Sequence, residues 1–262
     1  MVRGKAEDAG GLTPAKDDNA APYHFDPRTL PIFMCIDYNS RNRLVSWERS
    51  SAMEKMSNYE IQRRQWQERF LSMDQEALCR RLPGLELAES QLRLRHFGRL
   101  FAVSRRDGTI RCLTDGAPAS YNEAMNIYTL LHYARPDARW TGRWLPFRDL
   151  RHASPFASAY HSGIIRPLAR TFAGREDLLP GAVRELGGLR LDLHGYQLPA
   201  FECIPMRLYF WDGDEDFEAQ ANLLFDESAV DFIHVESVVT IASVGVFRLA
   251  EAAGLSPDGN AL

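Results

Sequence analysis

Apolar residues recur at helical spacing at the start of the region that carries a clear hydrophobic pattern. In the segment 59–71, Tyr59, Trp66 and Phe70 share one face of a helix. Further helices are predicted where a capping-box pattern, a proline or a long apolar periodicity marks a segment. These segments are 72–82 (opened by Ser72 with Gln75), 120–135 (opened by Ser120 with Glu123), 154–174, 180–186 and 236–253. Pro167 would interrupt the third of them.

Alternating apolar and polar residues predict strands between the helices. The segments concerned are 92–95, 100–103, 110–113, 189–193, 204–211 and 220–225. Asp107-Gly108 favours a tight hairpin because both residues tolerate positive φ. The segment 140–148 is too rich in aromatic residues, Gly and Pro to be a regular element. The pattern therefore predicts an α+β fold with a largely antiparallel sheet and helices packed around it.

Composition fits this picture of one main domain. The chain has 262 residues, of which 45% are hydrophobic and 25% charged, as in an average soluble globular protein. We expect a disordered tail over residues 1–21, an extended arm over 22–56, a single α+β domain over 57–254 and a C-terminal tail over 255–262. The longest uncharged apolar run, 237–247, is shorter than the roughly 20 residues that span a bilayer. We therefore expect a cytoplasmic protein without membrane contact.

Cysteine and arginine usage excludes several classes of function. The four cysteines form no Cys-x-x-Cys pair, which argues against an iron-sulfur or structural zinc site. The arginines between Arg41 and Arg111 are interleaved with acidic residues, so nucleic-acid binding is not expected. No HExxH, GxSxG or phosphate-loop pattern is present, which leaves the standard hydrolase and kinase mechanisms without support.

Acidic charge is concentrated in one part of the chain. Nine carboxylates and no Lys or Arg lie between Arg207 and Arg248. The formal net charge is -4, so this stretch of -9 leaves +5 for the remainder. An imbalance this local must be solvated, counter-charged or functional.

The predicted turn after residue 211 holds the densest group of carboxylates. Asp212, Asp214, Glu215 and Asp216 are candidate binding residues, and the last three are candidate ligands of a divalent cation. The turn is not an EF-hand, because Phe217 stands where that loop needs Gly. The alternative is a solvated hairpin tip whose charges keep the sheet edge from pairing with another chain. The sequence leaves both interpretations open.

Polar residues after the predicted strand 220–225 would extend such a site if the chain folded back. Asp226 is a candidate binding residue, and Asp231, His234 and Glu236 follow it. Capping of local turns and helix starts explains the same residues equally well.

A second candidate region is the aromatic segment 140–148. Trp144 and Arg148 would combine stacking with positive charge and so suit a flat anionic ligand. Packing of these aromatic residues on the core is the competing interpretation.

Two short strings resemble the signatures of a known family. GDEDFEA at 213–219 and LFD at 224–226 resemble the GDEEFPA and LFD motifs of a bacterial and archaeal domain-of-unknown-function family. The similarity extends from about residue 65 to 249, with Asp216 in place of Glu and Glu218 in place of Pro. Some relatives carry an iron-sulfur domain and belong to anaerobes. The resemblance thus implies a protein partner in metal or corrinoid chemistry.

Three hypotheses follow for function. The first is a ligand- or metal-binding accessory domain that uses the acidic hairpin. The second is a metal-assisted acid-base enzyme that uses Asp214, Glu215 and Asp216 with His234 or His161. The third is a purely structural turn, with a flat anionic ligand bound near Trp144 and Arg148. Convergence of the acidic side chains in a cleft would favour catalysis, whereas exposure to bulk water would favour partner binding.

Overall fold

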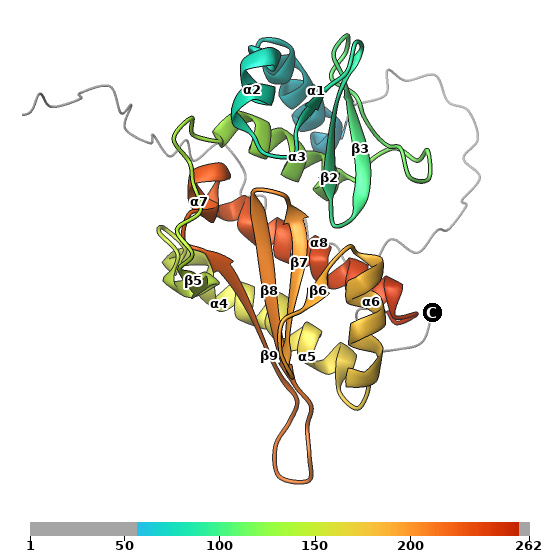
Figure 1. Ribbon diagram of the computed structural model, residues 1–262, viewed down its shortest axis with the longest axis vertical. Coiled ribbons are helices and arrows are strands. Elements are labelled where there is room, and N and C mark those ends of the chain that lie inside the picture. The colour runs from blue at the N-terminus through green and yellow to red at the C-terminus, as the bar shows by residue number, and fades with distance from the viewer. Residues whose placement is uncertain (1–56, 257–262) are drawn as a thin grey trace, which may run out of the picture. The chain divides into compact units, whose positions relative to one another are not determined.

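Two antiparallel sheets organise residues 57–256, the part of the chain that this computed structural model describes (Figure 1). The expected tail 1–21, the arm 22–56 and the last residues of the C-terminal tail lie outside the described residues. The expected α+β class is confirmed. None of the described helices is both long enough and apolar enough to cross a membrane.

The first sheet has four strands in the order β1-β2-β3-β4. The strands are β1 (Glu86–Leu87), β2 (Gln91–His96), β3 (Arg99–Ser104) and β4 (Ile110–Cys112). Helices α1 (Asn58–Leu71) and α2 (Gln75–Arg81) precede the sheet, and α3 (Tyr121–Tyr133) follows it. Both α1 and α3 begin with the expected kind of capping box, formed by Ser57 with Glu60 and by Ser120 with Glu123.

The second sheet has five strands in the order β5-β9-β8-β7-β6. The strands are β5 (Trp144–Pro146), β6 (Leu189–Arg190), β7 (Gly195–Phe201), β8 (Ile204–Trp211) and β9 (Gln220–Asp226). The helical elements around it are Phe147–Asp149, Ser154–Phe156, α4 (Ala157–Tyr160), a π-helix (His161–Ile165), α5 (Arg166–Phe172), Glu176–Leu178, α6 (Leu179–Glu185), α7 (Ala229–Phe232) and α8 (Val235–Ala252). Pro167 is the second residue of α5, and the π-helix directly precedes α5, so the expected interruption of a regular α-helix in segment 154–174 is confirmed.

One face of the five-stranded sheet is buried under helices and the other is open. Helices α5, α6 and α8 contact the sheet, and Figure 1 shows α4, α5 and α8 on one side of it. Met206, Leu208 and Phe210 of β8 point to the helices and are buried, whereas Arg207, Tyr209 and Trp211 alternate with them and reach solvent. This alternation and the antiparallel pairing of β8 with β9 confirm the hairpin predicted from the sequence.

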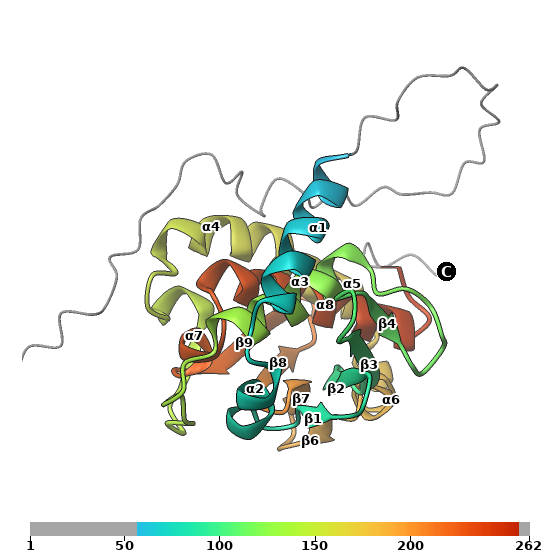
Figure 2. The same cartoon turned by 90° about the horizontal axis from the view of Figure 1, so that it is seen from above.

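Helix α8 lies at the junction of the two sheets. It packs against α3, which in turn contacts α1 (Figure 2). At Gly245 a Cβ atom would lie only 2.7 Å from Phe97 Cζ and 2.8 Å from Met206 Cε. A Cβ at this position would have to displace the ends of these two buried side chains, so glycine favours the close approach of α8 to the β2–β3 turn and β8.

The β2–β3 turn joins the two sheets. Its two residues, Phe97 and Gly98, have φ of 46° and 75°, which matches the twist of a two-residue hairpin. The Phe97 amide donates to the Pro199 carbonyl at 3.0 Å and to the Ala200 carbonyl at 3.3 Å. Strand β6 has only two residues and pairs with β7 at Tyr196 and Gln197. The rest of this edge of β7 is free of β6, and the turn donates its hydrogen bonds there.

Four local expectations were wrong. The N-cap of α2 is Asp74, whose carboxylate accepts from the Ala77 amide at 2.9 Å, whereas Ser72 ends α1. Five residues, not two, separate β3 from β4, although Gly108 does have positive φ. The segment 140–148 contains the regular strand β5.

The fourth wrong expectation concerns the strand 189–193. Only its first two residues form β6, and the three leucines of the segment are exposed. The longer strand, β7, comes later. A proline in a sequence argues against a central strand, because it cannot donate a backbone hydrogen bond. Pro199 of β7, however, lies beyond the residues that pair with β6, so no hydrogen bond to β6 is lost there.

Candidate functional site

The acidic turn forms the tip of the β8–β9 hairpin and extends beyond the sheet (Figure 1). Two of its carboxylates hold the backbone of the turn. Asp212 Oδ1 accepts from the amides of Gly174 and Gly213, both at 2.8 Å. Asp214 Oδ1 accepts from the amides of Asp216 at 2.9 Å and Phe217 at 2.8 Å. These oxygens therefore stabilise the turn and are already engaged.

The remaining acidic side chains of the tip are solvated. Glu215, Asp216 and Glu218 are exposed, and within residues 57–256 no carboxylate from 212 to 218 forms an ion pair. Phe217 is 68% exposed at the same tip. The tip thus presents negative charge and an apolar ring to bulk water.

Asp226 does not join the acidic tip. It lies at the far end of β9 and is 3% exposed. Its Oδ1 accepts from the amides and hydroxyls of Thr141 and Ser228, and its Oδ2 accepts from the Gly142 amide at 2.7 Å. Burial would raise the pKa of Asp226, but the hydrogen bonds from Ser228 and Thr141 outweigh it and hold the pKa below its usual value. Asp226 fastens the segment before β5 to the end of β9.

The open face of the five-stranded sheet carries a row of aromatic rings. The Arg207 guanidinium lies over the Trp144 ring, with 3.8 Å between its central carbon and the ring centroid. Further along β8, Tyr209 and Trp211 stack at a centroid distance of 6.1 Å and an interplanar angle of 18°. Trp211 is 43% exposed and directly precedes the acidic turn.

The aromatic side chains around β5 lie in different surroundings. Phe147 is buried and stacks on Tyr160, so this part packs on the core. Trp140 is mostly exposed, and its indole N–H donates to the Cys203 carbonyl at 2.9 Å. The Arg148 side chain is exposed and its nearest acidic partner is the neighbouring Asp149, at 3.9 Å. The cation over the Trp144 ring is Arg207, and a ligand shared by Trp144 and Arg148 stays a prediction.

His234 is distant from the acidic tip. It follows β9 at the end opposite to the tip, and its Nδ1 accepts from the Glu236 amide at the start of α8. A seven-residue strand spans about 20 Å, which is too far for His234 to share a proton or a metal with Asp214. Among residues 57–256, no group of three or more His, Cys, Asp and Glu side chains is arranged to hold a metal ion.

A groove lies on another part of the domain. It is open, has a volume of about 600 Å³ and is formed by α2, the β1–β2 turn and the β3–β4 loop. Its lining mixes carboxylates with Arg105 and Arg106 and includes none of the residues that the sequence predicted.

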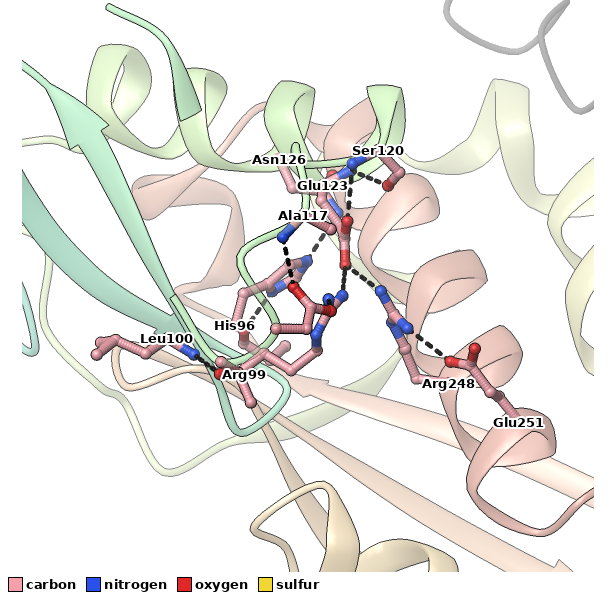
Figure 3. Close-up of polar contacts among 12 residues, drawn as sticks. His96, Arg99, Leu100, Ala117, Ser120, Glu123, Asn126, Arg248 and Glu251 are labelled. Atoms are coloured by element: carbon pink, nitrogen blue, oxygen red, sulfur yellow. Dashed lines mark hydrogen bonds and ion pairs between the residues drawn. The ribbon is translucent and has the colours of Figure 1, made fainter. Parts of the chain in front are cut away.

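A buried ionic cluster joins β3, α3 and α8 (Figure 3). Glu123 is almost fully buried, and its Oε1 accepts from Arg99 Nη1 at 2.6 Å and from Arg248 Nη2 at 2.5 Å. The other carboxylate oxygen accepts from the Ser120 amide. Arg99 also pairs with Asp115, and Arg248 pairs with Glu251. The sequence identified Glu123 as a capping residue but gave no signal for its two arginine partners.

His96 lies beside this cluster and bridges the two sheets. Its Nδ1 is 2.6 Å from the Ala200 carbonyl of β7, and its Nε2 is 3.2 Å from Asn126 Nδ2 of α3. The ring stacks on Phe201 at 4.3 Å. Burial, together with a smaller effect of nearby Arg99, outweighs the opposing bond to Ala200 and lowers the pKa of His96 to about 4. A neutral ring with its proton on Nδ1 satisfies both partners.

The fold defines the class as a two-sheet α+β domain with one open sheet face and an acidic hairpin. The chain belongs to the family described as domain of unknown function DUF3786, whose model matches residues 74–248. The matched residues lie within the range expected from the sequence, so membership in a family of unknown function is confirmed. No curated protein and no solved structure matches the chain.

Proposed function

We propose that this domain is a binding module that holds a partner protein at the acidic tip and on the open face of the five-stranded sheet. The proposal rests on one observation. The tip carries five carboxylates that no described basic side chain neutralises, together with the exposed ring of Phe217 and the neighbouring ring of Trp211. Exposed aromatic rings are the anchors that interfaces use, and charge around them steers association and gives specificity.

Binding fits this geometry better than catalysis does. The acidic side chains of residues 212–218 are exposed to solvent. The His194 ring lies 6.1 Å from that of Trp211, but its Nδ1 faces Glu176 at 3.6 Å. The tip therefore lacks the enclosed arrangement of groups that acid-base chemistry needs. A metal role of Asp214, Glu215 and Asp216 stays a prediction, as does a partner in metal or corrinoid chemistry.

Photo-cross-linking tests the proposal. A benzoylphenylalanine at position 217 of the full chain, expressed in its native host, is expected to give a discrete protein adduct on irradiation. The same group at Gln65, an exposed residue of α1, is the matched control. Equal adducts from both positions, or none from position 217, would contradict a binding role for the hairpin.

A further inference from the structure

We infer that the partner presents a basic segment, and that one of its arginine side chains stacks on Trp211 while the carboxylates of the tip pair with its charge. This inference rests on the proposed function and adds the chemistry of the partner. It starts from the open sheet face and not from the acidic residues alone.

The strand register places the aromatic residues on one face. Tyr209 is paired with Asn222 and Trp211 with Gln220, and these side chains alternate with the buried row that includes Leu208 and Phe210. At the other end of the same face, Trp144 is paired with Asp226 and Arg207 with Leu224. Apart from the buried Asp226, these side chains are half-buried or exposed, so the face is a continuous surface that ends at the acidic turn.

This face already holds one guanidinium on an indole ring. Arg207 lies over Trp144 at 3.8 Å, and its Nε also donates to Gln197 Oε1 at 3.4 Å. Arg207 is therefore engaged at its own end of the sheet. The rings of Tyr209 and His194 both lie 6.1 Å from that of Trp211, yet 43% of Trp211 is exposed, so its ring retains surface for a second cation.

Charge complementarity selects the occupant. The carboxylates of residues 212–218 lie next to Trp211, and no described Lys or Arg pairs with them. A ligand that combines positive charge with a flat stacking surface satisfies both the ring and the carboxylates, and arginine has both properties. Lysine would satisfy the carboxylates but would gain less from the ring.

Peptide binding to the full chain tests the inference. The probes are labelled decapeptides of alternating glycine with arginine, lysine or citrulline. We expect the arginine peptide to bind about fivefold more tightly than the lysine peptide, and the neutral citrulline peptide to bind weakest. Trp211→Leu should weaken the arginine peptide about tenfold and the lysine peptide less than twofold, whereas Trp211→Phe should retain most of the preference.

Two sets of carboxylate variants separate local recognition from general attraction. The first set combines Asp214→Asn, Glu215→Gln, Asp216→Asn and Glu218→Gln, and it should abolish binding of both basic peptides. The control set removes the same charge from exposed positions on other elements: Glu68→Gln, Glu86→Gln, Glu89→Gln and Glu185→Gln. It should change the affinity less than twofold. Thermal unfolding of each variant confirms that it is folded.

Several outcomes would overturn the inference. Equal affinity for arginine and lysine peptides, or no effect of Trp211→Leu, would leave only unspecific attraction. Equal effects of the two carboxylate sets would also mean that the attraction is unspecific. Calcium or manganese that displaces the peptide at micromolar concentration would make the tip a cation site. Specific cross-links from position 217, combined with equal binding of the peptides, would contradict this inference but support the proposed function. Failure of both experiments would contradict both.

Discussion

Individual buried polar residues carry the connection between the two sheets. His96 accepts one hydrogen bond and donates another only while it is neutral, and Glu123 neutralises two arginines that come from different elements. A change of charge at either residue leaves a buried group without its partner.

Acid is expected to destabilise the protein through His96. The pKa of its ring is lowered from 6.5 to about 4 in the folded state, so the unfolded state binds more protons between these values. The contribution of the neutral His96 ring to the free energy of unfolding is therefore fully present above pH 6.5. It falls by roughly 3 kcal/mol as the pH decreases to 4. Urea unfolding of the unmodified protein and of His96→Gln across this range measures the difference.

The matched control is His161→Gln, which changes an exposed histidine and should keep the pH dependence of the unmodified protein. NMR titration gives a second measurement that does not require a variant. A His96 ring that titrates near 6.5 in the folded protein would contradict the assignment.

Removal of the Glu123 charge should also destabilise the fold. Glu123→Gln keeps the shape and the capping oxygen but leaves Arg99 and Arg248 without their shared partner. We expect the free energy of unfolding to fall by about 2–3 kcal/mol. This is less than the roughly 3–5 kcal/mol lost when a fully buried ion pair is broken, because both arginines reach water. Chemical denaturation measures this. Glu251→Gln removes an exposed partner of Arg248 and should cost less than about 1 kcal/mol; equal losses would refute a central role of Glu123.

Among the helices and strands, those with a regular local pattern of hydrophobic residues were predictable from the sequence. The alternation of β8 and the apolar length of α8 predicted both elements within a residue or two, because each buries one regular face. Strand β7 was missed because its ends and partners are set by contacts from residues 96–97, about a hundred positions earlier. No local pattern contains that information.

The approach of α8 to the sheets gives a prediction for Gly245. Gly245→Ala would force a Cβ against Phe97 and Met206 and should destabilise the protein by about 1–3 kcal/mol, despite the better helix propensity of alanine. Gly163→Ala is the matched control, since nothing lies within 4 Å of its Cβ position. The urea midpoints of the two variants provide the measurement, and a neutral Gly245→Ala would mean that α8 moves aside.

For the described residues as a whole, the two sheets should unfold together. The β2–β3 turn is hydrogen-bonded to β7, and α8 contacts both α3 and the second sheet. We expect one transition when unfolding is followed by Trp66 of α1 and by Trp211 of β8 in variants that retain only one of these tryptophans. Separate midpoints would show that the sheets are independent units.

The candidate site was predictable only in part. Charge density in the sequence located the acidic tip, because carboxylates of adjacent residues need no tertiary contact to be close together. The same argument misplaced Asp226, which a strand of seven residues carries to the opposite end of the sheet. The stack of Arg207 on Trp144 joins residues 63 positions apart, so only the folded sheet reveals it.

The hairpin tip has consequences for how members of such a family can diverge. Apart from the bond of Asp212 to Gly174, the hydrogen bonds of Asp212 and Asp214 stay within the turn. Doubling the length of a loop costs only about 0.6 kcal/mol in closure entropy. We therefore expect insertions and exchanges of charge at this position to leave the fold intact, so that under the proposed function a change of partner needs no change elsewhere in the domain.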